Sequence, residues 1–137
     1  IELYNAGTSS VDLLQFVLWD GDAVDTIHGY SSFYDTILEP GAYALILDSE
    51  YASDYSDIPS DTLLLVTDDT TIGSGLATSD PISFYEGDAS SLIDSFSFPS
   101  NPGNGVSTER VDLSAGDESS NWAASGCTAT PGCANCQ

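Results

Sequence analysis

Three aspartates lie close together in the stretch from Asp20 to Asp25, the third being Asp22. Calcium takes hard oxygen ligands, and carboxylates spaced two or three residues apart on a turn can face one ion. The spacing matches the start of a calcium-binding loop but lacks the distal glutamate of the twelve-residue form. The alternative is a solvated acidic loop that keeps the domain soluble. No cofactor is certain from the sequence; calcium is the candidate, with Asp20, Asp22 and Asp25 as its ligands.

The cysteines Cys127, Cys133 and Cys136 all lie close to the C-terminus. In an oxidising compartment one pair forms a disulfide and one thiol is left over, and the spacing leaves all three pairings open. A zinc site built on Cys133 and Cys136 is the competing interpretation, but the chain lacks a second well-spaced ligand pair. The cysteines therefore favour a disulfide, and with it a secreted protein that works outside the cell or at its surface.

The sequence holds no arrangement typical of an enzyme. His28 is the only histidine, and no Gly-x-Ser-x-Gly turn is present to hold a serine nucleophile for it. Carboxylate pairs of the glycosidase kind are numerous only because acidic residues are numerous. Glycine-rich phosphate-binding loops are absent. We therefore predict a non-catalytic protein with no catalytic residue, and we expect His28 in an exposed loop.

A group of aromatic residues lies in segments rich in serine and aspartate. Its members are Tyr30, Phe33, Tyr34, Tyr51 and Tyr55. Exposed rings in such loops stack on sugars or on partner proteins, whereas packing against the core is the ordinary alternative. A glycan is accordingly one of the predicted partners.

The charge balance excludes several classes of partner. The chain has 22 Asp and Glu against one Lys or Arg, which gives a formal net charge of −21. Nucleic acids and anionic membranes are excluded as partners, because neutralising phosphates requires lysine and arginine. No apolar run approaches the roughly 18 residues of a membrane span, so no membrane insertion is expected. Such a charge destabilises a compact fold unless salt or calcium screens it. A saline or calcium-containing exterior, or the interior of a halophile, meets that need.

Alternation of apolar and polar residues dominates the chain and predicts strands. The predicted strands cover residues 1–4, 11–19, 42–47, 62–66, 81–85, 92–98 and 107–113. Asp94 has the same parity as Leu92 and Phe96, so we expect a bulge or a strand end there. A chain of 137 residues is long enough for one core. About eight short strands separated by turn residues predict an all-β, antiparallel β-sandwich in a single domain over residues 1–137.

Short motifs along almost the whole chain add to this prediction. They are Ile1–Asn5, Val11–Leu13, Leu38–Gly41 with Tyr43, Ile72–Leu76 leading to Asp94–Ser95, then Gly105, Ser107, Glu109, Arg110, Trp122, Pro131, Gly132 and Asn135. In this order they resemble the lamin tail domain family, in particular its bacterial, secreted type. The resemblance implies an immunoglobulin-like β-sandwich that is usually non-catalytic, followed here by a short cysteine-containing segment (126–137).

Two of these residues have structural roles that need no family. Trp122 is a large apolar body suited to closing one end of a sandwich. Arg110 can clamp carboxylates bidentately, and no other Lys or Arg is available to replace it. We predict that both hold the fold together.

The chain departs from the family pattern at its start. Family domains normally carry an apolar strand before the segment that here begins at Ile1, so one sheet is expected to lack its first edge strand. Either the sequence is cropped or a neighbouring subunit supplies the strand. An open edge at Ile1 and Leu3 would pair with another chain. We therefore predict an extracellular assembly module that associates with itself, as in a filament, or with other surface proteins. The alternative is a targeting module that holds a larger secreted protein to a glycan or cell surface.

Overall fold

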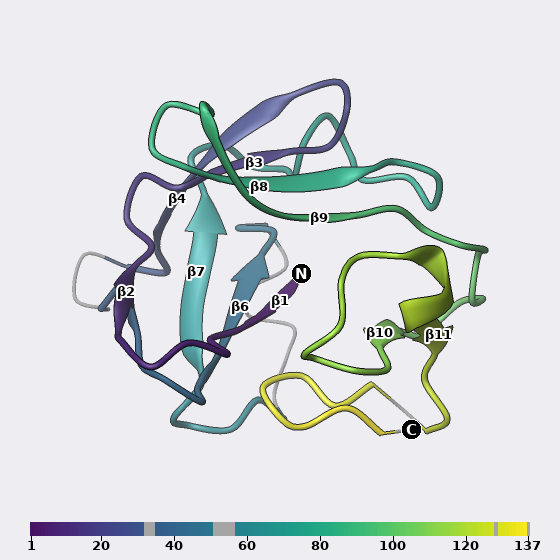
Figure 1. Ribbon diagram of the computed structural model, residues 1–137. Helices are drawn as coiled ribbons and strands as arrows, with labels where there is room; N and C mark the ends of the chain where they lie inside the picture. The colour runs from purple at the N-terminus through teal and green to yellow at the C-terminus, as the bar shows by residue number, and fades with distance from the viewer. Residues whose placement is uncertain (32–34, 51–56, 128, 137) are drawn as a thin grey trace.

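The computed structural model describes residues 1–31, 35–50, 57–127 and 129–136. These residues form strands and, apart from the 3₁₀ turn η2 (Ser119–Asn121), no helix (Figure 1). The strands are β1 (Glu2–Tyr4), β2 (Val11–Asp12), β3 (Val17–Trp19), β4 (Val24–Gly29), β5 (Ile37–Leu38), β6 (Tyr43–Leu47), β7 (Leu63–Thr67), β8 (Ile82–Glu86), β9 (Ser91–Phe96), β10 (Thr108–Arg110) and β11 (Trp122–Ala124). The all-β class predicted from the sequence is confirmed.

Seven of the strands form one mixed sheet in the order β1-β6-β7-β4-β3-β8-β9. Only β6 and β7 pair in parallel, and every other neighbouring pair is antiparallel. Two small ribbons, β2-β5 and β10-β11, complete the fold. Figure 1 shows β3, β8 and β9 turning across the top of β6 and β7, so that the sheet curls. Its edge strands are β1 and β9. The immunoglobulin-like arrangement stays a prediction.

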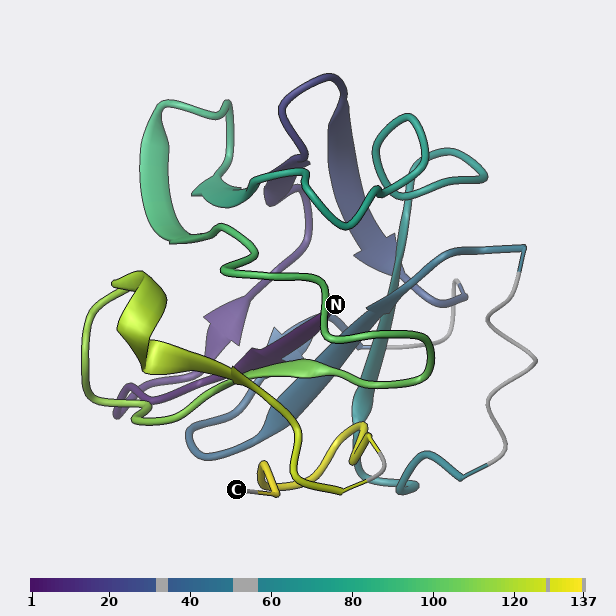
Figure 2. The same cartoon turned by 90° about the vertical axis from the view of Figure 1, so that its right-hand side faces the viewer.

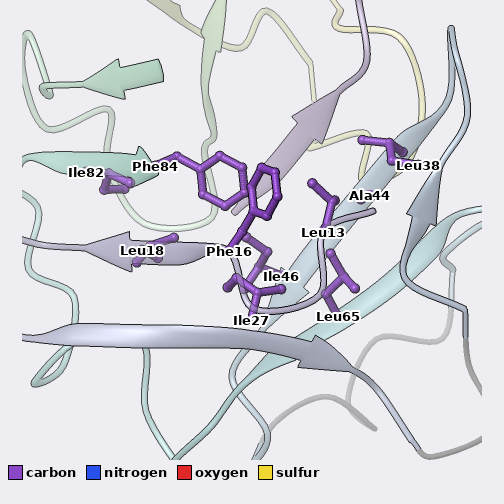
Figure 3. Close-up of a cluster of buried hydrophobic side chains, with 10 residues drawn as sticks. All are labelled: Leu13, Phe16, Leu18, Ile27, Leu38, Ala44, Ile46, Leu65, Ile82 and Phe84. Atoms are coloured by element: carbon purple, nitrogen blue, oxygen red, sulfur yellow. The ribbon is translucent and has the colours of Figure 1, made fainter. Parts of the chain in front are cut away.

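The curled sheet encloses one main hydrophobic core. Buried side chains from the sheet, from β5 and from the segment between β2 and β3 meet there; they are Leu13, Phe16, Leu18, Ile27, Leu38, Ala44, Ile46, Leu65, Ile82 and Phe84 (Figure 3). The rings of Phe16 and Phe84 pack with their centroids 5.4 Å apart. A close-packed core of this kind is the main source of stability in a domain of this size.

The strand predicted over 11–19 is interrupted. The Asp12 carboxylate accepts the Leu14 amide at 3.0 Å, and the Leu13 carbonyl accepts the Phe16 amide at 3.1 Å. Gln15 adopts a positive φ of 67°, a conformation that belongs to turns. This turn points both Leu13 and Phe16 into the core, which a continuous strand with its period of two could not do.

Asp94 lies beside a register shift, as expected from its parity. Phe84 pairs with Asp94 but the next residue, Tyr85, pairs with Leu92. Ile93 is therefore the extra residue of a bulge, and the bulge places the carboxylate of Asp94 at the surface of the sheet.

Three strands, β4, β5 and β11, were not expected from the sequence, and the placement of His28 was wrong. His28 is half-buried in β4 and pairs with Val66 of β7 instead of lying in an exposed loop. The physical reason is the alternation of β4, in which Asp25 and Ile27 are both buried. A buried aspartate on the inward face hides the apolar period.

Candidate functional site

A half-open cavity of about 760 Å³ lies between the two edges of the curled sheet. Residues 1–6, which include β1, line one side, and Ile93, Asp94, Ser95 and Phe96 of β9 line another. Residues 106–110 and Trp122, from the β10-β11 ribbon and the segment before it, line a third side together with residues 129–131 and Asn135. Residues of the hydrophobic core, among them Phe16 and Phe84, also line the cavity. In Figure 2 this ribbon lies in front of β1. The volume falls within the range of about 300–1,000 Å³ that is typical of binding sites.

β1 has one paired and one open side. The Ile46 amide donates to the Ile1 carbonyl at 2.8 Å, and the Asn5 amide donates to the Ala42 carbonyl at 3.1 Å. Because backbone groups alternate in direction along a strand, those of Glu2 and Tyr4 point away from β6. β1 is the last strand of the sheet, and no backbone partner for these two residues exists in the described part of the chain.

Ile1 and Leu3, the residues expected at the open edge, belong to the edge strand but do not carry its open backbone groups. Their side chains pack against the main core and line the cavity. Leu3 pairs with Ala44 of β6, so its backbone groups belong to the sheet. The open backbone groups are those of Glu2 and Tyr4. Backbone groups of successive residues point to opposite sides of a strand, so pairing of Leu3 with β6 directs those of its two neighbours outward.

Of the carboxylates that line the cavity, Glu109 is buried and Glu2 is half-buried. Glu109 in β10 is only 7% exposed. Its Oε1 accepts the Ser107 hydroxyl at 2.8 Å, whereas no donor in the described segments reaches its buried Oε2. Glu2 accepts the Gly132 amide at 2.6 Å. Burial raises the pKa of Glu2, and the nearby charge of Glu109 adds to this increase.

Neither glutamate stands out in the sequence as a candidate site residue. Glu2 alternates with the apolar Ile1 and Leu3, which ordinarily indicates a solvated side chain. Glu109 was noted only as part of the resemblance. Their place in the wall depends on β10 and the C-terminal segment folding back over β1, which no local pattern shows.

Arg110 and Trp122 form a single cluster at one end of the cavity. The Arg110 guanidinium lies 3.0 Å from Asp94 Oδ1 and 3.5 Å from Asp117 Oδ1. It stacks over the Trp122 ring at 4.8 Å. The Trp122 indole N–H donates to Asp117 at 2.8 Å, and its ring packs on Phe96 with 4.3 Å between centroids. These contacts join β9, β10 and β11; that both residues hold the fold together stays a prediction.

The predicted calcium loop is held by backbone amides. Asp20 and Asp25 are buried, each 2% exposed, whereas Asp22 is exposed. Asp20 accepts the amides of Asp22 at 2.9 Å, Ala23 at 2.7 Å and Ser74 at 3.2 Å. No group of three metal-ligating side chains occurs within the described ranges. Calcium binding at Asp20, Asp22 and Asp25 stays a prediction.

The titration of the two buried aspartates differs. The backbone hydrogen bond from Ala23, assisted by other amides, lowers the pKa of Asp20. Burial raises the pKa of Asp25, and the carboxylates of Asp69 and Asp68 raise it further, although Asp25 accepts the Gly73 amide at 2.5 Å.

Of the three cysteine pairings left open, the structure contains the disulfide Cys127–Cys136. Cys133 is exposed and lies outside it. Because Cys136 is oxidised, the pair Cys133 and Cys136 does not provide two thiolates for zinc. The segment that the disulfide closes reaches the cavity wall, where the Asn135 amide group donates to the Arg110 carbonyl at 3.0 Å.

Most of the aromatic group proposed for glycan binding lies outside the described residues. Phe33, Tyr34, Tyr51 and Tyr55 fall there, and the remaining Tyr30 is half-buried and packs on Leu45 and Leu47.

No helix in the described segments has the length and apolar character of a membrane span.

Comparison of the chain with protein-family models, with curated proteins and with solved structures finds no match.

Proposed function

We propose that this protein is a non-catalytic, extracellular assembly module that accepts an extended segment of another polypeptide along β1. The observation that carries the proposal is the open edge of β1, where the backbone groups of Glu2 and Tyr4 point away from the sheet toward a large cavity. A sheet edge with unpaired amide and carbonyl groups is a template for strand addition.

The second edge of the sheet supports the same function. β9 is the other terminal strand, and its residues line the cavity that β1 also lines. A segment inserted at this place would hydrogen-bond to β1 through its backbone and would lie within reach of side chains from β9. Alternate side chains of the insert would enter the cavity, because side chains of a strand alternate between its two faces.

The extracellular setting rests on the chemistry of the chain. A structural disulfide persists in oxidising compartments. A net charge of −21 needs salt or a divalent cation to screen it, and calcium is one such cation.

A synthetic peptide tests strand addition directly. The peptide alternates valine with glutamine over about nine residues, near the upper length of an ordinary strand, and is blocked at both ends. We expect calorimetric binding and slower exchange of the outward amide hydrogens of Glu2 and Tyr4. Tyr4→Pro should abolish binding, because proline removes the outward amide and leaves the amides that pair with β6 in place.

Tyr4→Val is the matched control. It removes the same ring, including its contact with Tyr43, but keeps the amide, so the peptide should still bind. Circular dichroism must show that both variants are folded. Equal binding to Tyr4→Pro and Tyr4→Val would show that β1 does not accept a strand.

A further inference from the structure

The cavity is half open to solvent and has room for an occupant. Its walls are mainly apolar and carry aromatic rings, including Phe96, Phe98 and Trp122. An apolar space of about 760 Å³ offers water few hydrogen-bond partners. The chemistry of the walls therefore favours an occupant with apolar side chains.

The polar groups of the wall specify the occupant further. Glu109 is only 7% exposed, and its Oε2 has no hydrogen-bond donor within the described segments. A second oxygen-bearing side chain of β10, Thr108, likewise has a buried Oγ1 without a partner there. An unsatisfied buried carboxylate oxygen is costly, so an occupant that brings a donor is favoured.

The charge of the wall is negative. Glu2, Glu109 and Asp94 all line the cavity. The only cationic side chain among the lining residues is Arg110, and it is already engaged by Asp94, Asp117 and Trp122. A lysine or arginine from the occupant would pair with the remaining carboxylates and make charge-assisted hydrogen bonds.

This balance distinguishes a foreign partner from a second copy. A second copy brings 22 acidic residues and one Arg, and that Arg110 is engaged within its own fold. Two such chains repel each other, and neither has a free lysine to offer Glu109. Charge complementarity therefore points to a basic partner.

We propose, resting on the assembly function above, that the cavity receives an extended segment of a different polypeptide, in which apolar residues alternate with polar ones that include lysine or arginine directed at Glu109 and Glu2. Its backbone pairs with β1, and its apolar side chains fill the space beside Phe96 and Trp122. Its cationic side chain pairs with the two carboxylates of the wall.

Three matched peptides test the identity of the partner. They share the alternating valines and carry lysine, glutamine or glutamate at the polar positions. Trp122 lines the cavity, and Trp19→Phe leaves it as the only tryptophan, so its fluorescence reports occupancy. We expect the lysine peptide to bind at least about tenfold more tightly than the glutamine peptide at low salt, and the glutamate peptide to bind weakest.

Two variants locate the cation. Glu109→Gln keeps the shape of the side chain and should remove most of the preference for lysine over glutamine. Glu86→Gln, an equal charge change at an exposed residue outside the wall, should leave the preference intact. Val106→Phe adds bulk to a lining residue without changing charge and should weaken all three peptides, so the test holds even if Glu109→Gln does not fold.

The outcomes separate the two proposals. Equal affinity for the three peptides, or the same lysine preference in Glu109→Gln and Glu86→Gln, overturns the basic partner and leaves strand addition standing. No binding of any peptide overturns both proposals. A lysine peptide interrupted by prolines that binds as tightly as the unbroken one would show a site for an apolar amine rather than for a strand.

Discussion

Arg110 concentrates several interactions in one side chain, and no other Lys or Arg in the chain can share them. Its guanidinium reaches Asp94 and Asp117 and covers Trp122. Asp94 and Asp117 differ in exposure, since 52% and 25% of their side chains are accessible. The pair with Asp117 is therefore the one less screened by solvent.

Arg110→Ala should lower the free energy of unfolding by about 2–4 kcal/mol, because it leaves a half-buried carboxylate unpaired and removes packing on Trp122. Urea denaturation followed by circular dichroism measures this. Arg110→Lys keeps the charge but loses the planar fork and the stacking, so it should recover only part of the loss. Equal stability of wild type and Arg110→Ala would show that the cluster does not hold β9, β10 and β11 together.

The buried aspartates Asp20 and Asp25 predict opposite responses to pH. The pKa of Asp20 is lowered in the folded state, so its contribution to stability is present above the unfolded pKa and is lost as pH falls through the folded one. The pKa of Asp25 is raised, so ionised Asp25 costs stability at neutral pH, and this cost disappears as pH falls through the folded pKa.

Asparagine substitutions separate these two contributions. At pH 7, Asp20→Asn should lose about 1.5–3 kcal/mol, the range for hydrogen bonds to a charged group. Asp25→Asn should be as stable as wild type or more stable, since it keeps an acceptor for the Gly73 amide without a buried charge. Both differences should shrink as pH falls toward the acid range, measured by urea denaturation at a series of pH values. A large loss in Asp25→Asn at pH 7 would contradict this assignment.

At the scale of elements, the loop before β8 is fitted onto the turn that joins β3 and β4. Gly73 has a φ of +62°, and a Cβ there would overlap the Asp20 carboxylate. Gly87, in the β8-β9 turn, has the same φ of +62° with nothing within 4 Å of its Cβ position. An alanine would therefore meet the same backbone strain at both positions, and the two positions differ only in what its Cβ would contact.

Gly73→Ala should lose clearly more stability than Gly87→Ala. We expect about 1 kcal/mol for the left-handed backbone alone, and an additional loss of about 1–3 kcal/mol at Gly73 from overpacking against Asp20. Thermal denaturation of the two variants measures the difference. Equal losses would mean that the loop and the turn do not pack as described.

The elements also show where a sequence predicts this fold and where it does not. Strands such as β6 and β8 were predicted because their apolar runs are bounded by turn residues. β4 was not, because Asp25 occupies an inward position that only backbone amides from a distant loop make tolerable. The break at Gln15 depends on the core's need for both Leu13 and Phe16, which is a tertiary requirement.

The candidate site was predictable only in part. The resemblance indicated an open edge near Ile1 and Leu3, and strand parity then assigns the open backbone groups to Glu2 and Tyr4. The carboxylate wall was not predictable, because Glu2 and Glu109 approach through contacts between opposite ends of the chain, such as the hydrogen bond from Gly132 to Glu2. The local periodicity of apolar residues does not reveal contacts between residues so far apart in the sequence.

For the whole molecule, charge and cavity act on assembly in opposite directions. The apolar cavity and the open edge favour association, whereas a charge of −21 disfavours association with another acidic chain. Salt or calcium weakens the repulsion but also weakens the attraction for a basic partner. Screening therefore distinguishes the two kinds of partner.

Sedimentation velocity of the intact protein provides this test. Alone, the protein should remain a monomer in calcium, in chelator and in sodium chloride at matched ionic strength, because screening removes repulsion without supplying a strand that carries a cationic side chain to Glu109. Its complex with the lysine peptide should dissociate progressively as salt is raised from about 50 to about 500 mM. Over this range the screening length falls about threefold, to a few Å. Polymers that form in calcium and dissolve on chelation would instead identify a second copy as the donor of the strand. In that case the edge of β1 would still accept a strand, with calcium replacing lysine between two acidic chains.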